Sequence, residues 1–367
     1  MTKTMRAIGL MSGTSMDGID VALIETDGKN AVARGPCATF PYDTAFRALL
    51  VRAAADAAGL DDRTARPGCL AEVERDLTGR HAAAVAEFMR TKNIPADSVD
   101  VIGFHGHTVL HEPHRLRTVQ IGDGRALAQR TGIDVVYDLR ANDVESGGQG
   151  APLAPVYHRA LAAKLEDRPV AIVNIGGVAN VTWIGGDGTL IAFDTGPGNA
   201  LLDDWVAART GQAFDESGKL AAAGRVDESI LKELLRNPYF GRPPPKSLDR
   251  DAFSSAPASH LSAADGAATL AAFTAAAIAR ARAHFPEEPR LWVICGGGRR
   301  NRTLMSMVAA DVESAVIPAE AAGLNGDAVE AEAWAYLAVR SLKGWPITFP
   351  GTTGVPRPMP GGVLARK

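Results

Sequence analysis

The stretch AIVNIGGVANVTWI, at Ala171–Ile184, joins two apolar runs of β-strand composition through a pair of glycines. Two comparable stretches are IGLMSGTSMDGID at Ile8–Asp20 and LWVICGGGRRN at Leu291–Asn301. Glycines after a buried strand let backbone N–H groups approach a ligand closely, and concave runs of N–H groups suit phosphate oxygens. None of the three contains GxxxxGK[ST], the pattern of a Walker A loop, or GxGxxG, the pattern of a dinucleotide-binding fold. One glycine pair is often only a tight turn, but three together predict a nucleotide site.

Working outward from these stretches, each half of the chain opens with a strand, a glycine turn and a second strand. The first half then favours helices over 43–60, 70–93 and 124–131 and strands over 99–104 and 133–137. The second half favours strands over 170–175, 179–184, 190–193 and 291–295, and helices over 152–164, 199–210, 262–285 and 327–342. The pattern predicts a duplicated α/β fold with a cleft between the copies, as in sugar kinases, actin and chaperone ATPases.

The chain has 367 residues, which is longer than one hydrophobic core usually supports. We expect two domains, an N-terminal one over 1–145 that carries the first glycine loop and a C-terminal one over 146–367. The segment VESGGQGAPLAP, at Val144–Pro155, has the glycine and proline content of a hinge or a cleft wall.

Charge and composition exclude several functions. The net charge of −3 and the scattered basic residues provide no field for nucleic acid. The first apolar run is too short for a signal peptide, and no run reaches the roughly 18 apolar residues of a membrane span. Cys37, Cys69 and Cys295 form neither an even set nor a CxxC pair, so we expect reduced thiols and a cytoplasmic protein.

Asp194 is the strongest candidate for chemistry. It follows the apolar run 190–193 and opens the sequence TGPGN, so its carboxylate is expected at a strand end beside glycines. A carboxylate in a cleft can serve as the base in phosphoryl transfer. The alternative is a cap on the helix expected near Asn199, but five residues is a long way for a cap.

The other acidic residues and the histidines leave alternatives open. Asp17 and Asp20 could order the water shell of a magnesium ion or form Asx turns. The four histidines of HGHTVLHEPH, at 105–114, fit no familiar zinc spacing and favour polar lining over a metal site. Glu330 suits the first turn of a helix, and it acquires a chemical role only if that turn faces the substrate.

These residues resemble one family. GLMSGTSMDGID, HGHTVLHEP, VQIGD, GIDVVYDLRANDVESGGQGAPLAP, VNIGGVANV, FDTGPGN and CGGGRRN are similar, in this order, to motifs of the 1,6-anhydro-N-acetylmuramic acid kinases. The resemblance extends from Ile8 to beyond Leu337. It implies a fold of the actin, hexokinase and chaperone-ATPase superfamily, a homodimer, and ATP with Mg²⁺ as phosphate donor. The implied reaction opens the anhydro ring while phosphorylating the sugar, which gives N-acetylmuramic acid 6-phosphate in peptidoglycan recycling.

The resemblance also assigns roles to residues. Asp194 matches the catalytic aspartate and Glu330 an assisting acid, and no metal ligand is assigned. The expected nucleotide-binding residues are Ser12, Gly13, Thr14, Ser15, Met16, Asp17, Gly18, Gly176, Gly177, Asn180, Gly196, Gly198, Asn199, Gly296, Gly297 and Gly298. The expected substrate-binding residues are His105, Thr108, Arg140, Gln149, Gly150 and Pro152, with Arg140 as a partner for the lactyl carboxylate or a phosphate.

The chain departs from the family pattern at two places. His107 stands where the family usually has Gln, and the family's KSTGRE loop is KSLDRD here, at 246–251. Two other functions remain as alternatives. One is a kinase for an ordinary sugar hydroxyl, and the other is a chaperone-like ATPase, against which the roughly 25 residues after the last expected helix argue.

Overall fold

The computed structural model describes residues 3–13 and 15–367, and these divide into two compact units. Unit 1 comprises residues 1–163 and 328–367, and unit 2 comprises residues 164–327. The division differs from the predicted boundary at 145/146, since 146–163 and the C-terminal segment 328–367 belong to unit 1. Chain order alone could not show that the polypeptide returns to the first unit.

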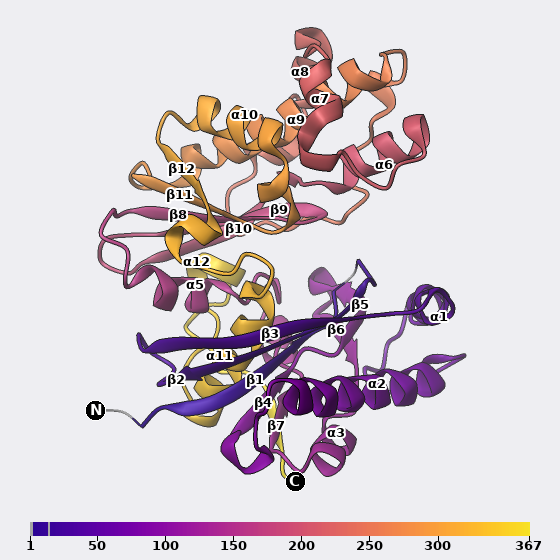
Figure 1. The fold of residues 1–367 in the computed structure, drawn as a ribbon, viewed down its shortest axis with the longest axis vertical. Coiled ribbons are helices and arrows are strands. Elements are labelled where there is room, and N and C mark those ends of the chain that lie inside the picture. The colour runs from indigo at the N-terminus through magenta and orange to yellow at the C-terminus, as the bar shows by residue number, and fades with distance from the viewer. Residues whose placement is uncertain (1–2, 14) are drawn as a thin grey trace. The chain divides into compact units, whose positions relative to one another are not determined.

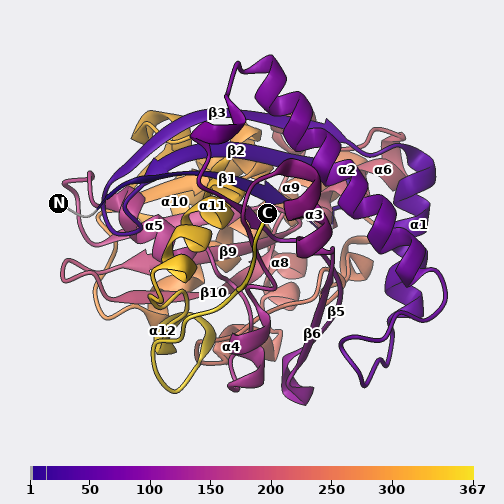
Figure 2. The same cartoon turned by 90° about the horizontal axis from the view of Figure 1, so that it is seen from below.

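Unit 1 is a six-stranded sheet with the order β13-β7-β4-β1-β2-β3, accompanied by the two-stranded sheet β5-β6. Figure 2 shows β1, β2 and β3 side by side. The strands are β1 Met5–Met11, β2 Gly18–Thr26, β3 Val32–Pro41, β4 Val101–Phe104, β5 His107–Glu112, β6 Arg117–Ile121, β7 Val135–Tyr137 and β13 Val363–Ala365. The helices are α1 Thr44–Asp56, α2 Leu70–Thr91, α3 Gly124–Thr131, α4 Ala141–Glu145, α5 Pro155–Ala162, α11 Val329–Leu342 and α12 Pro350–Thr353.

Unit 2 is a five-stranded sheet with the order β10-β9-β8-β11-β12 (Figure 1). Its strands are β8 Val170–Ile175, β9 Val178–Ile184, β10 Leu190–Pro197, β11 Leu291–Cys295 and β12 Ala315–Pro318. Its helices are α6 Ala200–Thr210, α7 Lys219–Ala223, α8 Glu228–Leu234, α9 Ala263–Arg280 and α10 Arg302–Val312. Ser262 caps α9 by accepting a hydrogen bond from the Asp265 N–H, as its sequence predicts.

The two sheets repeat one topology. In unit 1, β1 pairs antiparallel with β2, β2 antiparallel with β3, and β1 and β7 each pair parallel with β4. In unit 2, β8, β9 and β10 take the places of β1, β2 and β3, and β11 and β12 those of β4 and β7. The predicted duplicated α/β fold is therefore confirmed. The first two glycine stretches form the β1–β2 and β8–β9 turns, and the third follows β11.

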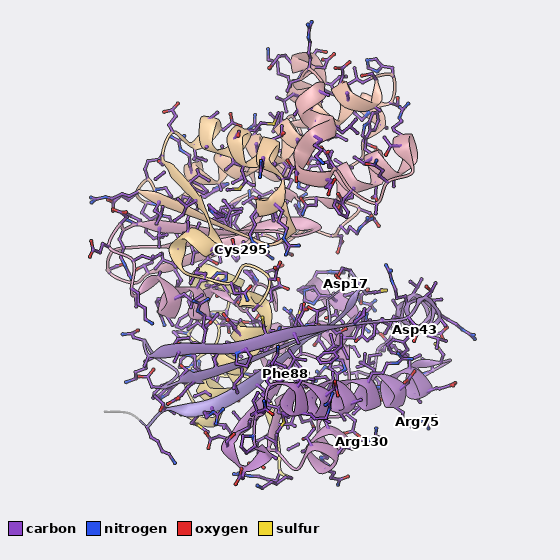
Figure 3. All side chains as sticks on the ribbon, viewed as in Figure 1. Asp17, Asp43, Arg75, Phe88, Arg130 and Cys295 are labelled. Carbon is purple, nitrogen blue, oxygen red and sulfur yellow. The ribbon has the colours of Figure 1, made fainter. Side chains whose placement is uncertain are left out.

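Successive residues of β1 face opposite sides of the sheet, and this alternation decides what packs on each side. Ile8 and Leu10 are fully buried in the same core as Phe88 of α2, which Figure 3 labels. Gly9 faces the other way, where a methyl group would lie 1.8 Å from the Ala331 carbonyl oxygen of α11. Gly103, its partner on β4, meets the backbone of Trp334 equally closely, at 2.0 Å. These two glycines let α11 lie directly on the sheet, which places Trp334 beside the ends of β1 and β4.

None of the helices in the described part of the chain is both long and apolar enough to cross a membrane.

Candidate active site

A row of polar residues crosses the unit 2 sheet at the glycine turn. Asp194 on β10 pairs with Asn180 on β9, and Asn180 pairs with Asn174 on β8. Direct partners on neighbouring strands present their side chains on the same face of a sheet. The strand that carries Asp194 continues to Pro197, beyond the predicted end at Phe193, and a bulge follows Asp194. Bulges often occur next to active sites, because they redirect a side chain.

The segment 239–248 holds Asp194 at three atoms. The Leu248 N–H donates to Oδ2 at 2.8 Å, the Asp194 N–H donates to the Lys246 carbonyl at 3.0 Å, and the Tyr239 hydroxyl donates to the Asp194 carbonyl. The alternative that Asp194 caps a helix is not supported, since α6 begins at Ala200 with Asn199 in the cap position. Asp194 is partly exposed, so a ligand can reach it.

The surroundings of Asp194 suit a general base near neutral pH. Burial raises the pKa of its carboxyl group to about 7, against the lowering effect of the Leu248 hydrogen bond, and the nearby Asp249 charge raises it further. The Lys246 amine lies 3.2 Å from His284 Nε2 and 3.3 Å from the Tyr239 carbonyl oxygen. Burial lowers the pKa of Lys246 to about 8, and the charge of Arg242 adds to this effect. A base works best when its pKa is close to the working pH.

Packing explains some of the predicted nucleotide-binding glycines. A methyl group at Gly198 would lie 2.2 Å from the Gly176 carbonyl oxygen, and one at Gly298 would lie 2.4 Å from Ile175 Cγ2. Gly296 has φ +73°, and Gly196 is pressed against Ala277 of α9 at 2.7 Å. The fold itself therefore requires these four glycines, whether or not a ligand binds.

Four other predicted glycines have no such explanation. Methyl groups at Gly13, Gly176, Gly177 and Gly297 would approach other atoms no closer than 3.5 Å, and none of these glycines has a positive φ. The turn at 176–177 is nevertheless rigid, since its carbonyls accept hydrogen bonds from the N–H groups of 198, 199 and 200. An open glycine on a rigid turn is expected where a ligand comes close to the backbone.

The first glycine loop is anchored at its beginning. Ser12 is fully buried, and its hydroxyl accepts a hydrogen bond from Tyr42 at 2.9 Å and lies 3.2 Å from His107 Nδ1. Further along, the Met16 N–H donates to Gly13 O, and Met16 adopts a φ of 55°. Ser15 Oγ donates to Asp17, whereas Gly18 lies too close to Phe40 for a side chain. The predicted nucleotide contact at Thr14 falls outside the described residues.

The histidine segment joins this loop to Arg140. His105 Nδ1 lies 3.1 Å from the Ser12 carbonyl oxygen, and its Nε2 accepts from Arg140 Nε at 3.2 Å and from Nη2 at 3.1 Å. His107 is fully buried, and burial lowers its pKa to about 4, so it is neutral at pH 7. Thr108 accepts a hydrogen bond from Gln120. Among the described residues, no cluster of three or more His, Cys, Asp or Glu side chains that could hold a metal is found.

Arg140 is a partly buried cation of unit 1. Its Nη1 donates to the Gly150 carbonyl at 2.7 Å, and its guanidinium lies over the Trp334 ring at 5.1 Å. Burial lowers the pKa of Arg140 to about 10, while the charges of Glu330 and Asp143 oppose that change. Arg140 is therefore still charged at pH 7, and Glu330, which is exposed in the first turn of α11, lies within its electrostatic reach.

The predicted substrate segment 149–152 is held by a residue that the sequence did not indicate. Asp143 is buried and accepts hydrogen bonds from the Gly150 N–H at 2.7 Å and the Thr353 hydroxyl at 2.6 Å. The Gln149 N–H donates to the Thr353 carbonyl, and the bond between Ala151 and Pro152 is cis. No sequence signal connects Asp143 with Thr353, because 210 residues separate them.

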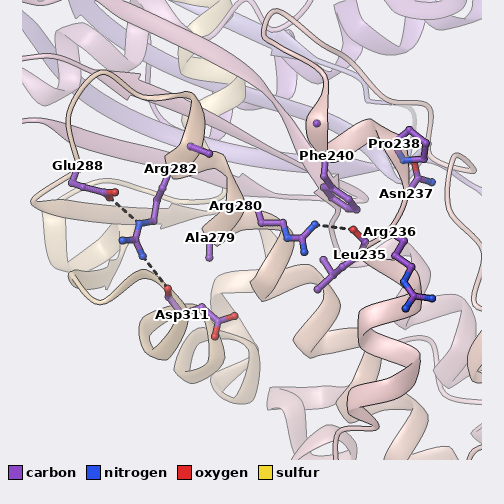
Figure 4. Close-up of a pocket in the computed structure, with 12 residues that line it drawn as sticks. Leu235, Arg236, Asn237, Pro238, Phe240, Ala279, Arg280, Arg282, Glu288 and Asp311 are labelled. Atoms are coloured by element: carbon purple, nitrogen blue, oxygen red, sulfur yellow. Dashed lines mark hydrogen bonds and ion pairs between the residues drawn. The ribbon is translucent and has the colours of Figure 1, made fainter.

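A surface cavity of about 740 Å³ lies elsewhere in unit 2 and includes none of the predicted residues (Figure 4). Arg280 donates to the Leu235 carbonyl at the end of α8, and Arg282 donates to the Asp311 carbonyl near the end of α10 and to Glu288. Arginines commonly bind the last carbonyls of helices in this way. Helix termination therefore accounts for the two arginines that line this cavity.

The comparison with known proteins identifies the family. The sequence pattern described as anhydro-N-acetylmuramic acid kinase matches residues 5–367. The chain belongs to the anhydro-N-acetylmuramic acid kinase family. Relatives with that name are 54% identical in Rhizobium etli, over 98% of both chains, and 55% identical in Rhizorhabdus wittichii, over 100% of both.

Solved structures resemble this family member only weakly. A ROK family glucokinase from Streptomyces griseus, in complex with glucose and AMPPNP, is 15% identical and has a TM-score of 0.41, covering 90% of this chain and 98% of that one. A chain of the PilM-PilN type IV pilus biogenesis complex is 13% identical with a TM-score of 0.48, covering 91% and 98%.

The structure of this kinase family member brings together residues that sequence analysis had singled out separately. Asp194 and Asn180 lie in one row, and Ser12, His105 and Arg140 form one hydrogen-bonded chain. Sequence analysis missed Trp334, because an aromatic residue within a helix usually signals only core packing. Glu332, which the sequence places in the first turn of the last helix, is buried there and accepts a hydrogen bond from Tyr157 at 2.7 Å.

Proposed function

We propose that this protein is an ATP-dependent kinase that opens the 1,6-anhydro ring of 1,6-anhydro-N-acetylmuramic acid and phosphorylates the sugar to N-acetylmuramic acid 6-phosphate, in cell wall recycling. Family membership over residues 5–367 supports the activity. The observation that carries the mechanism is Asp194, a partly exposed carboxylate with a pKa of about 7 in a polar row beside an open glycine turn.

The glycines fit ATP as phosphate donor. A methyl group would make only ordinary contacts, at 3.5 Å or more, at Gly13, Gly176, Gly177 and Gly297, so packing does not require a glycine at these positions. Such positions accept phosphate oxygens, because backbone N–H groups carry partial positive charge and no side chain stands in the way. The packing glycines beside them fix the shape of these loops.

We assign to Asp194 the role of general base. Its carboxylate takes a proton from a water molecule, whose oxygen then bonds to the anomeric carbon of the sugar. The bond from that carbon to the bridging oxygen breaks, and the released oxygen attacks the γ-phosphorus of ATP, which leaves ADP. A glycosidase needs a second carboxyl group to protonate the departing oxygen. Here phosphorus captures that oxygen, so one principal carboxylate is enough.

On the sugar side, Arg140 is proposed to bind the lactyl carboxylate. A guanidinium has five N–H donors, of which the contacts to His105 and Gly150 use three. The two that remain match the two oxygens of a carboxylate. Glu330 is proposed to assist Asp194, as the family resemblance implies, and its exposure leaves it accessible to a ligand.

Three further features are proposed on the family resemblance. Mg²⁺ would neutralise the charge that develops on the phosphates, and Asp17 and Asp20 are the candidates for ordering its water shell. In the structure, Asp17 accepts a hydrogen bond from Ser15, and Asp20 accepts one from Thr39. A homodimer and a cytoplasmic location also remain predictions, and so does the cleft.

One incubation tests the function. The protein is mixed with ATP, Mg²⁺ and the anhydro sugar in ¹⁸O-labelled water, and the product is identified by mass. We expect a sugar 6-phosphate that carries one solvent oxygen at the anomeric carbon. Phosphorylation of the opened sugar alone would instead identify an ordinary sugar kinase.

Substitution tests the role of Asp194. Asp194→Asn keeps an oxygen for the Leu248 N–H but removes the base, so turnover should fall about 100-fold or more while ATP affinity survives. Asp187→Asn, in the exposed turn of the same β9–β10 hairpin, is the matched control and should keep full activity. Full turnover in the Asp194 variant would refute the assignment.

A further inference from the structure

Trp334 contacts His105, Arg140 and Met11, and the proposed reaction gives these residues no common role. Its ring lies 4.5 Å from the His105 ring and 5.1 Å from the Arg140 guanidinium, and its Nε1 donates to the sulfur of Met11 at 3.0 Å. Met11 ends β1 and directly precedes Ser12. The indole therefore contacts both the start of the first glycine loop and the arginine proposed to bind the sugar.

His105 connects the same two places by hydrogen bonds. The Ser12 carbonyl can only accept, so His105 Nδ1 carries the ring proton and donates to it. Nε2 is then free of a proton and accepts from Arg140, which fits the two contacts observed there. Both nitrogens are used within the protein, and the ring is only 5% exposed. His105 thus links Ser12 with Arg140 and has no nitrogen left for a ligand.

The surrounding structure allows this group little freedom. Trp334 is 4% exposed and belongs to α11, which Gly9 and Gly103 hold against the sheet. Glu330, one helical turn before Trp334, lies on the same side of α11, and its charge reaches Arg140. A shift of the loop at Ser12 would consequently have to move His105, and with it Arg140.

We propose that Trp334 and His105 are positioning residues that couple the first glycine loop to Arg140, so that the nucleotide and the anhydro sugar each tighten the binding of the other. The inference rests on the proposed function, because it takes the loop as the nucleotide side and Arg140 as the sugar side. Because Ser12, His105 and Arg140 can move only together, a ligand that holds one end of the hydrogen-bonded chain in place also holds the other end in place for the second ligand.

Calorimetric titration measures this coupling. The dissociation constant of a non-hydrolysable ATP analogue with Mg²⁺ is determined with and without saturating anhydro sugar, and the dissociation constant of the sugar with and without the analogue. We expect each ligand to tighten the other by the same factor, of about 5-fold or more. Equal affinities with and without the second ligand would overturn the proposal. If the wild-type protein bound neither ligand, the proposed function would fail first.

Two variants locate the coupling. Trp334→Leu removes the aromatic ring that contacts His105 and Arg140, and it should bring the coupling factor close to 1. Trp334→Phe keeps an aromatic ring beside both residues and should retain part of the coupling. Trp345→Leu is the matched control, because Trp345 also lies beside cationic side chains in unit 1, those of Lys29 and Lys343. Thermal unfolding establishes that each variant is folded, and the Phe variant keeps the test decisive if the Leu variant does not fold.

His105→Phe tests the hydrogen bonds separately, since it keeps a ring against Trp334 and removes both nitrogens. It should abolish the coupling while the affinity for the nucleotide analogue alone changes less than the affinity for the sugar. Long-range ¹⁵N spectra of the wild-type protein should show the His105 proton on Nδ1. A full coupling factor in this variant, or a proton on Nε2, would contradict the proposed chain.

Discussion

Gly177→Ala separates ligand binding from folding. A methyl group at this position would meet the Ala200 methyl at 3.6 Å, an ordinary contact, and the backbone φ does not lie in the left-handed region. Gly-to-Ala changes at compatible positions stabilise a protein by about 0.4–1 kcal/mol, because they restrict the unfolded chain. In a domain of this size that corresponds to a rise of roughly 1–4 °C in Tm.

Nucleotide binding should respond in the opposite direction. A methyl group on the open turn occupies the space through which a phosphate would approach the backbone, so the KM for ATP should rise about tenfold or more, a loss of about 1.4 kcal/mol. Steady-state kinetics at varied ATP measures the change, and differential scanning calorimetry measures the stability. The expected result is a well-folded protein that binds ATP poorly.

Gly198→Ala is the matched control from the same turn. Its methyl group would lie 2.2 Å from the Gly176 carbonyl oxygen, so the backbone must shift. Overpacking of this kind costs about 1–3 kcal/mol, and Tm should fall by several degrees. If Gly177→Ala left the KM for ATP unchanged, or destabilised the protein as much as Gly198→Ala does, the reasoning from open glycines would be refuted.

Three further predictions concern titration and the substrate segment. Because Asp194 must be ionised to accept a proton and its pKa is about 7, kcat/KM should rise with pH through 7, and Asp249→Asn should move the midpoint to lower pH. Burial lowers the pKa of both His81 and His107 to about 4, so below pH 6.5 the unfolded state binds more protons than the folded state. Each histidine should therefore lower the free energy of unfolding by about 2 kcal/mol between pH 8 and pH 5, which urea denaturation measures. An unchanged free energy would contradict this. Asp143→Ala leaves the Gly150 N–H without its acceptor, so it should cost about 1–3 kcal/mol and raise the KM for the sugar, and normal kinetics would argue against the role of that segment.

Acid sensitivity and catalysis can be told apart in these experiments. The histidine effect appears in unfolding free energies and acts below pH 6.5, where the stability present at higher pH is lost as the pH falls toward 4. The Asp194 effect appears in the rate of a protein that is still folded near pH 7. A single pH profile of activity, measured together with unfolding at each pH, therefore separates them.

Local sequence determined much of the fold. Each half of the chain begins with two apolar runs separated by glycines, and this pattern predicts a hairpin. Both hairpins, β1–β2 and β8–β9, are present. The cap at Ser262 was also predictable, because a side chain three residues before a backbone N–H acts locally. By contrast, four strands were missed: β12 and β13 are only four and three residues long, and the sequences of β5 (HTVLHE) and β6 (RTVQI) mix charged and polar residues with the apolar ones.

The site was predicted only in part for the same reason. Residues at the ends of apolar runs, such as Asp194 and the open glycines, could be singled out, because a strand end is visible in the sequence. Asp143 and Trp334 could not, since Thr353 lies 210 residues from Asp143 and Met11 lies 323 residues from Trp334 in the chain.

The sequence by itself determined that two similar α/β units carry glycine turns and one well-placed aspartate. Only the tertiary structure decided that residues 328–367 belong to unit 1, that α11 lies on Gly9 and Gly103, and that Trp334 consequently reaches both Met11 and Arg140. The physical reason is the range of the interactions. Hydrophobic periodicity and capping act over a few residues, whereas the close approach of a helix to a sheet depends on the absence of two side chains that lie far from that helix in sequence.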